Sequence, residues 1–246
     1  MQIIQQILFI LLSGIAIWLF TKKVKEIRRN ILLGRDEVIS DNRSQRWKNV
    51  FLLAFGQKKM FRNPLVAVLH FFVYAGFIII NIEILEIILD GISGSHRLFA
   101  PSIGNLYNIL IGCFEILAVL VLAGCAVFLI RRNIIKLKRF ISKDLDGWPR
   151  SDANYILITE IILMTLFLTM NTADQVLQSR GAEHYHQTGN FWVTGSLTSI
   201  LNGLPASSLI FMERFCWWLH IIGVFAFLNY LPFFDSFSGK YTIAMH

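Results

Sequence analysis

Apolar residues in this chain are gathered into five long blocks separated by polar connections. The blocks lie at about residues 3–20, 65–89, 105–130, 155–172 and 208–231. All five are dominated by Leu, Ile, Phe and Val, without the strict alternation of an outer-membrane barrel strand. At about 1.5 Å per residue each can cross about 30 Å of hydrocarbon, although the first and fourth are near the lower limit. The pattern predicts an all-α integral membrane protein, a five-transmembrane-helix bundle at 1–233 with a short cytoplasmic tail at 234–246.

Basic residues indicate the orientation of this bundle. Residues 21–64 contain twelve Lys and Arg and residues 131–154 contain seven, whereas the opposite side has only Arg97, Arg180 and Arg214. Because cytoplasmic loops are enriched in Lys and Arg, we predict that the N-terminus is outside and the C-terminus is cytoplasmic. The net charge of +7 then follows from topology and contact with lipid headgroups, and it is no argument for nucleic-acid binding.

The first block and the cysteines limit the classes of protein further. We expect the first block to be a membrane anchor and not a signal peptide, because its charges follow the apolar run and no small-residue cleavage site is present. The three cysteines, Cys113, Cys125 and Cys216, are isolated within apolar blocks and form no CxxC pair. We therefore expect neither a disulfide framework nor an iron–sulfur cluster in this chain, so that any cluster comes from a partner.

Two histidines, His70 and His220, lie inside apolar blocks. An imidazole at membrane depth is costly without a partner, and neutral imidazole is a good ligand for haem iron. We therefore interpret His70 and His220 as candidate axial ligands of haem b. At 1.5 Å per residue, His70 lies roughly 9 Å and His220 roughly 18 Å from the cytoplasmic edge. Either one haem bridges tilted helices or the histidines belong to different sites, and for His70 a hydrogen bond to another helix is the simpler alternative.

Carboxylates inside the apolar blocks are further candidates. Glu83 and Glu86 lie in the half of the second block nearer the outside, and a carboxylate in lipid is protonated, paired or lines a polar cavity. Because quinol oxidation releases protons, Glu83 and Glu86 are candidate quinol proton acceptors. A hydrogen bond from a neutral Glu to another helix is an equally good interpretation of each one.

Three residues near the outer ends of the blocks are weaker candidates. Arg214 can contact a haem propionate or pair with its neighbour Glu213, and we favour the second interpretation. His184 and His186 are two residues apart in a polar loop, which is weak evidence for a metal site.

Motifs in the second and fifth blocks resemble a known family. LHIIG at 219–223, continuing to NYLPF at 229–233, resembles the last helix of the gamma-subunit family of respiratory nitrate reductase. GQKK at 56–59, followed by RNP at 62–64 and then His70, is similar to the start of the second helix in heterodisulfide-reductase-like iron–sulfur oxidoreductases. The resemblance covers nearly the whole chain. It implies five spans with an outside N-terminus in a bacterial or archaeal cytoplasmic membrane.

The resemblance also implies a function and its cofactors. In the family, the second and last helices carry the haem b ligands, here His70 for the inner haem and His220 for the outer one. The family passes electrons between menaquinone or ubiquinone and a cytoplasmic iron–sulfur protein or domain. The family has a further histidine about eighteen residues after the position of His220, and Ser238 stands there in this chain. The chain also stops at His246, where relatives run on into an iron–sulfur domain. Because Ser238 replaces that further histidine, we expect at most one haem per chain.

Together these observations favour a haem b membrane subunit that relays electrons between the quinone pool and a cytoplasmic iron–sulfur partner. Such a protein is an electron-transfer subunit of a quinone-linked oxidoreductase and not a complete enzyme alone. The alternative is a haem-free membrane anchor that docks a soluble redox partner through its basic loops. A transporter is disfavoured, because the sequence shows no inverted repeat and no pair of helices broken by Gly or Pro.

Overall fold

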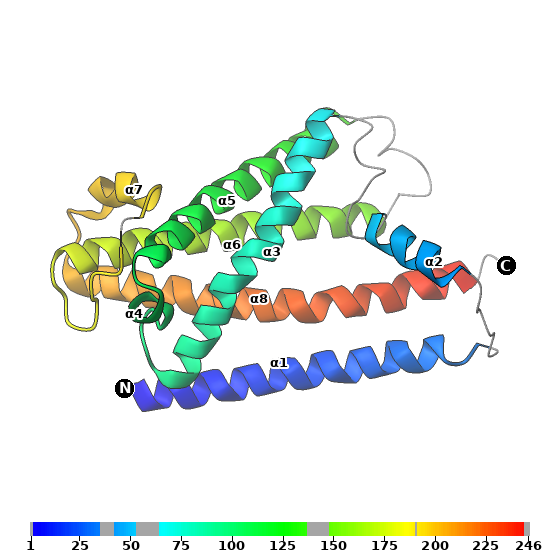
Figure 1. Cartoon of the computed structure of the whole chain (residues 1–246), viewed down its shortest axis with the longest axis horizontal. Helices are drawn as coiled ribbons and strands as arrows, with labels where there is room; N and C mark the ends of the chain where they lie inside the picture. The colour runs from blue at the N-terminus through cyan, green and yellow to red at the C-terminus, as the bar shows by residue number, and fades with distance from the viewer. Residues whose placement is uncertain (1, 35–41, 53–63, 137–147, 190, 244–246) are drawn as a thin grey trace.

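The computed structural model describes residues 2–34, 42–52, 64–136, 148–189 and 191–243, and over these ranges it is a bundle of helices without strands (Figure 1). Five helices are long and apolar enough to cross a membrane, as the hydrophobic pattern predicts. They are α1 (Gln2–Ile31), α3 (Pro64–Ser93), α5 (Asn105–Leu129), α6 (Trp148–Ser179) and α8 (Ala206–Ile243). The shorter helices are α2 (Arg43–Val50), α4 (Phe99–Ile103), the π-helical turn η3 (Ile130–Ile134) and α7 (Thr194–Leu201).

The long helices extend beyond the apolar blocks that predict them. α1 continues from the predicted end at residue 20 to Ile31, and α6 continues from 172 to Ser179. In both cases the added residues include Lys, Glu, Arg or Gln, which are good helix formers although they are polar. α8 continues through Pro232 to Ile243, so that most of the predicted tail is helical. The domain boundary at residue 233 stays a prediction.

Two opposite ends of the bundle are distinguished by their short helices. α4 and α7 lie at the end where α1 and α8 begin and α3 and α6 finish, here named the α4/α7 end (Figure 1). α2 lies at the opposite end, here named the α2 end, and α3 crosses the other helices obliquely in this view. The described loops and short helices therefore lie near one of these two ends, and the long helices between them are joined mainly by apolar packing.

Close packing between helices occurs where glycines face side chains. A Cβ built on Gly223 of α8 would lie 2.6 Å from Leu163 of α6, and one on Gly91 of α3 would lie 2.6 Å from the ring of Phe9. Phe9 is itself only 1% exposed and anchors α1 against α3 and α8. Many Ile, Leu and Phe side chains on the outer faces of the helices are exposed, which is the surface that lipid contact requires. The glycines thus bring α6 to α8 and α1 to α3.

Cysteine labelling can test the predicted orientation of the bundle. That orientation rests on the distribution of Lys and Arg: with Lys240 left out, nineteen lie in the two connections predicted to be cytoplasmic and three lie on the opposite side. We expect a membrane-impermeant maleimide to label Ser199→Cys in intact cells. Gln45→Cys is expected to react only after the cells are opened. Both variants are made in a chain whose own three cysteines are replaced. The reverse pattern, or proteolysis at Arg139 from outside intact cells, would contradict this topology.

Candidate functional site

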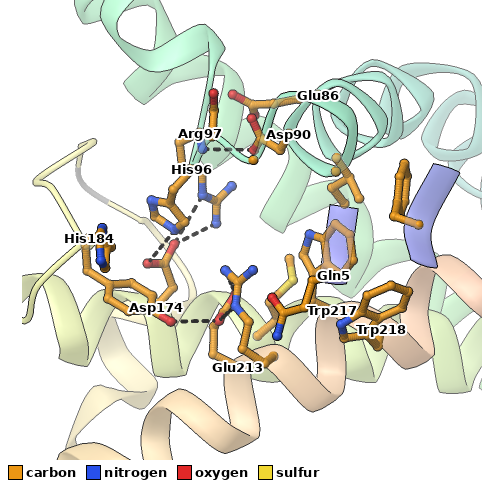
Figure 2. Close-up of a pocket in the computed structure, with 18 of the residues that line it drawn as sticks. Gln5, Glu86, Asp90, His96, Arg97, Asp174, His184, Glu213, Trp217 and Trp218 are labelled. Carbon is orange, nitrogen blue, oxygen red and sulfur yellow. Dashed lines mark hydrogen bonds and ion pairs between the residues drawn. The ribbon is translucent and has the colours of Figure 1, made fainter. Parts of the chain in front are cut away.

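A cavity of about 400 Å³ lies among the helices at the α4/α7 end of the bundle (Figure 2). Its lining comes from α1, α3, α6 and α8 and from the loops that follow α3 and α6. Trp217 and Trp218 lie on one side of it, and His96 and Asp174 lie across from them. The ring of Phe9 lies 5.5 Å from that of Trp217, centre to centre, and closes the aromatic side. The cavity is therefore aromatic on one side and hydrogen-bonding on the other.

Three carboxylates on one face of α3 position the loop that enters this cavity. Glu83, Glu86 and Asp90 are spaced by three and four residues, which places them on the same side of a helix. Asp90 accepts hydrogen bonds from the backbone N–H groups of Arg97 at 2.9 Å and Leu98 at 3.0 Å. These bonds hold Arg97 in a left-handed conformation with φ of 56°, which is uncommon for a residue with a side chain.

Glu86 is fully occupied by hydrogen bonds. One oxygen accepts the backbone N–H of Phe99 at 2.8 Å, and the other accepts the hydroxyl of Tyr107 at 2.7 Å. Through these bonds Glu86 connects α3 to the start of α4 and to α5. It lines the cavity, but neither of its oxygens lacks a partner.

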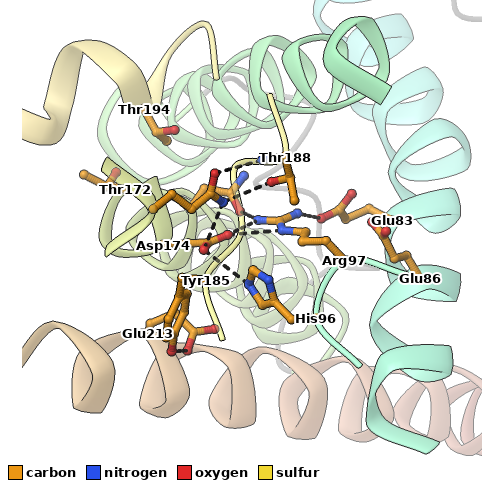
Figure 3. A network of polar contacts seen from close by, with 12 residues as sticks. Glu83, Glu86, His96, Arg97, Thr172, Asp174, Tyr185, Thr188, Thr194 and Glu213 are labelled. Carbon is orange, nitrogen blue, oxygen red and sulfur yellow. Dashed lines mark hydrogen bonds and ion pairs between the residues drawn. The ribbon is translucent and has the colours of Figure 1, made fainter. Parts of the chain in front are cut away.

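Arg97 is the centre of a buried ionic network (Figure 3). Its Nη1 donates to Glu83 at 2.8 Å, and its Nη2 donates to Asp174 at 3.0 Å and to Asn171 at 2.7 Å. The side chain is only 6% exposed. Burial alone would lower the pKa of Arg97, but the neighbouring anionic groups, including Asp174 and Glu83, raise it well above its usual value. The guanidinium is therefore permanently charged and joins α3 to α6.

Asp174 accepts hydrogen bonds from three side chains. Besides Arg97, its partners are His96, whose Nε2 lies 3.2 Å from Oδ1, and Gln178, whose amide donates at 3.1 Å. Gln178 also pairs with both the hydroxyl and the backbone N–H of Thr188. Asp174 is consequently held in one orientation and connects the loop after α3 to the loop after α6.

A second buried carboxylate, Glu115 of α5, organises α7. It accepts the backbone N–H groups of Val193 at 2.8 Å and Thr194 at 3.3 Å, together with the Thr194 hydroxyl. Asn171 donates to Glu115 at 3.3 Å while it accepts from Arg97. The start of α7 is thereby linked, through Asn171, to the ionic network.

The α8 side of the cavity has its own polar group. Tyr185 donates its hydroxyl to Glu213 at 2.9 Å, and Arg214 donates to the same carboxylate. Burial raises the pKa of Tyr185, and the Glu213 carboxylate adds to this shift. Arg214 is thus paired with Glu213, which is the interpretation that the sequence favours.

His184 and His186 also line the cavity. Over the described ranges no three His, Cys, Asp or Glu side chains are arranged to hold a metal ion. The structure therefore gives no support to the weak evidence for a metal site in this loop.

The two intramembrane histidines have different surroundings. His220 is 1% exposed, and its Nδ1 donates to the backbone carbonyl of Leu163 at 3.0 Å. It lines a second, mostly apolar cavity of about 100 Å³ with Ile80, Asn81 and Met164 among its other walls. His70 does not line this cavity, and its ring lies 6.4 Å from that of Phe128 on α5. The described contacts do not bring the two histidines together.

The structure thus gathers only some of the residues that the sequence predicts. Glu83, Glu86 and Arg214 line the large cavity, whereas His220 lines the small one and His70 lines neither. The sequence does not predict His96 and Asp174 as site residues, and Arg97 serves there only to orient the helices. One feature of the sequence does indicate a buried ionic site here: a lone Arg follows, by a few residues, three acidic residues on one helix face.

Comparison with known proteins supports a redox role. The chain is 25% identical over 229 residues, 92% of its length, to "Probable iron-sulfur-binding oxidoreductase FadF" of Bacillus subtilis (strain 168). It is also 25% identical over 225 residues, 88% of its length, to "EtfAB:quinone oxidoreductase" of Syntrophomonas wolfei subsp. wolfei (strain DSM 2245B / Goettingen). The chain spans only 30% and 28% of these two relatives.

Both similarities agree with the iron–sulfur oxidoreductase group that the sequence motifs suggest. No protein-family model matches the chain, and no solved structure gives a significant match. The more specific likeness to nitrate reductase gamma subunits stays a prediction.

The buried Arg97 network is expected to stabilise the fold. Arg97→Met leaves Glu83 and Asp174 without their cation, which costs about 3–5 kcal/mol for a buried pair. For a chain of this size, that corresponds to a melting temperature lower by roughly 6–20 °C in a thermal unfolding assay in detergent.

Arg180→Met is the matched control, because Arg180 lies at the same end of the bundle but is exposed and donates to backbone carbonyls. Its cost is expected to be about 1 kcal/mol or less. Equal melting temperatures for the two variants would show that the network does not stabilise the protein.

Proposed function

We propose that this chain is the quinone-reactive membrane subunit of an iron–sulfur oxidoreductase. In this role it exchanges electrons between membrane quinone, either menaquinone or ubiquinone, and a cytoplasmic iron–sulfur protein or domain. The observation that carries the proposal is the cavity of about 400 Å³ between apolar helices at the α4/α7 end. Its volume lies within the range of roughly 300–1,000 Å³ that is usual for small-molecule sites.

The lining of the cavity suits a quinone ring. Such a ring is flat and apolar, and it carries two oxygens that accept hydrogen bonds in the quinone and donate them in the quinol. Phe9, Trp217 and Trp218 offer aromatic surfaces against which a flat ring can pack. The opposite side offers hydrogen-bonding groups, among them His96 and Glu83, to the two oxygens of the ring.

Glu83 is better suited than Glu86 to accept a quinol proton. Its Oε1 pairs with Arg97, but its Oε2 is buried and has no hydrogen-bond partner within the described part of the chain. Both oxygens of Glu86 are already occupied. Because a buried acceptor without a donor is costly, a quinol hydroxyl would stabilise Glu83 and would add little at Glu86.

The similar proteins support this proposal. The name of one refers to iron–sulfur binding and that of the other to quinone oxidoreduction. The chain corresponds to less than a third of each, so we propose that the iron–sulfur centre lies in a partner or in a further domain. The concentration of basic residues at the α2 end favours that end as the cytoplasmic face where this partner docks.

A haem b between His70 and His220 is less well supported. His220 suits one axial position, because donation by Nδ1 to Leu163 leaves Nε2 available to iron. However, the cavity beside His220 is about 100 Å³, and His70 does not line it. These residues do not fit a haem held by both histidines. Haem b, at most one per chain, therefore stays a prediction from the sequence.

The proposed subunit can relay electrons through a haem b of its own or can lack haem. The poor fit favours the second candidate function, a haem-free membrane anchor of a redox complex. In this version the chain still provides the quinone pocket and docks the soluble partner through its basic α2 end. Electrons would then pass between quinone and the partner's own centres.

Quinone binding tests the proposed function directly. We expect menadione or decylubiquinone to quench the fluorescence of the purified full chain saturably, because two tryptophans line the cavity. Gly91→Ala places a methyl group against the ring of Phe9 and is expected to weaken binding at least about tenfold, or ~1.4 kcal/mol.

Gly14→Ala is the matched control, because it makes the same change on α1 where nothing lies within 4 Å. It should bind both quinones as the unmodified chain does. Absence of saturable quenching in the unmodified chain would refute the quinone pocket.

A reduced-minus-oxidised spectrum separates the two candidate functions. A b-type band supports the haem-containing subunit, and its absence supports the haem-free anchor. If the band is present, His220→Ala is expected to abolish it and His70→Ala to retain it, because His220 lines the smaller of the two cavities described above and His70 lines neither. Loss of the band in both variants would instead support a haem shared by the two histidines.

A further inference from the structure

His96 lines the large cavity, and neither the sequence motifs nor the similar proteins assign a role to it. The residue lies just beyond the end of α3, and its side chain is 17% exposed. Its Nε2 lies 3.2 Å from Oδ1 of Asp174, and the ring of Tyr185 packs edge-on against it with centroids 5.1 Å apart (Figure 3). Contacts from α6 and from the loop after α6 therefore fix the orientation of the imidazole.

The hydrogen bonds around Asp174 determine the tautomer of His96. Asp174 is paired with the guanidinium of Arg97 through two N–H groups, so it is held as a carboxylate that can only accept hydrogen bonds. Nε2 of His96 must therefore carry the hydrogen that points to Asp174. In the neutral imidazole, Nδ1 is then an acceptor with a free lone pair.

Nδ1 of His96 is buried and, within the described residues, has no hydrogen-bond partner. Buried polar atoms normally have one. Two buried acceptors without donors, His96 Nδ1 and Glu83 Oε2, thus belong to residues that line the same cavity. A quinol is a ligand of matching chemistry, because it carries two hydroxyl donors.

We propose that His96 is the catalytic base that takes a proton from the quinol, and that Asp174 is the positioning residue that holds it. The proposal rests on the quinone pocket proposed above. When the quinol is oxidised, its two O–H bonds break and it loses two protons and two electrons. One proton goes to Nδ1 of His96 and the other to Oε2 of Glu83. The electrons pass one at a time to the iron–sulfur class of carrier in the assembled complex, and quinone reduction reverses each transfer.

The charges around His96 favour this transfer. Asp174 is held as a carboxylate by Arg97, and its Oδ1 lies 3.2 Å from Nε2 of His96. When Nδ1 takes up a proton, this neighbouring negative charge stabilises the imidazolium that forms.

The other two histidines of the cavity lack this arrangement. His184 and His186 lie in the loop after α6, and neither is hydrogen-bonded to a carboxylate in the described structure. A histidine that is held by a carboxylate at one nitrogen is the arrangement in which the other nitrogen acts as a base. The geometry therefore selects His96.

The test uses the native complex in its own membranes, with menadiol as electron donor and an artificial dye as final acceptor. His96→Gln can still donate an amide N–H to Asp174 but has no basic nitrogen. We expect kcat to fall by about 10²-fold or more, the usual contribution of a general base. KM and the quenching affinity for menadione are expected to change less than about threefold, because binding in the ground state is retained.

Chemical rescue separates a base from a structural residue. Added imidazole is expected to restore part of the kcat of His96→Gly, whereas pyrrole, which has the same size but no basic nitrogen, should not. Asp174→Asn is expected to lower kcat without abolishing menadione binding. Asp152→Asn is the matched control on the same helix, because Asp152 pairs with Tyr230 near the opposite end of α6.

The possible outcomes distinguish this inference from the proposed function. If the unmodified chain does not bind menadione, both are overturned. If it binds menadione but His96→Gln keeps at least half of the kcat, only the role of His96 is overturned. Equal rescue by imidazole and pyrrole would also overturn it, because the residue would then merely fill space.

Discussion

The α4/α7 end of this protein depends on one buried guanidinium. A charge removed from water is tolerated only when its partners compensate for the lost hydration, and Arg97 has partners on two long helices, Glu83 on α3 and Asp174 on α6. Asn171 extends the network from Arg97 to Glu115, which holds the start of α7. The same side chains that satisfy the charge therefore set the relative positions of α3, α5, α6 and α7.

The sequence predicts the helices of this protein better than its site. Five apolar blocks are sufficient to predict five helices, since only a helix satisfies the backbone in lipid. The pattern does not predict Asp174, because the predicted fourth span ends at residue 172, while the polar residues beyond it continue α6 to Ser179. Its pairing with Arg97 joins residues 77 positions apart, and no local pattern encodes that distance. Glu83 was predicted because a carboxylate inside an apolar block is informative without any partner.

The two cavities differ in chemistry as well as in size. The large one combines aromatic rings with charged and hydrogen-bonding groups, whereas the small one beside His220 is mostly apolar. Spacing along the chain predicts different depths for His70 and His220, but it does not show which cavity each side chain faces, because the rotation and tilt of each helix decide where its side chains point. Helix packing, including the contact of Gly223 with Leu163, determines those rotations.

The contribution of both α1 and α8 to the large cavity has a consequence for biosynthesis. Glu83 precedes Arg97 in the chain, and Asp174 and Trp217 follow much later. During synthesis Arg97 can therefore pair with Glu83, which is made before it. The aromatic side of the cavity is complete only when α8 has been inserted. The first helix must stay close to the growing chain until then, and a nascent protein that lacks α8 has the ionic network without an enclosed pocket.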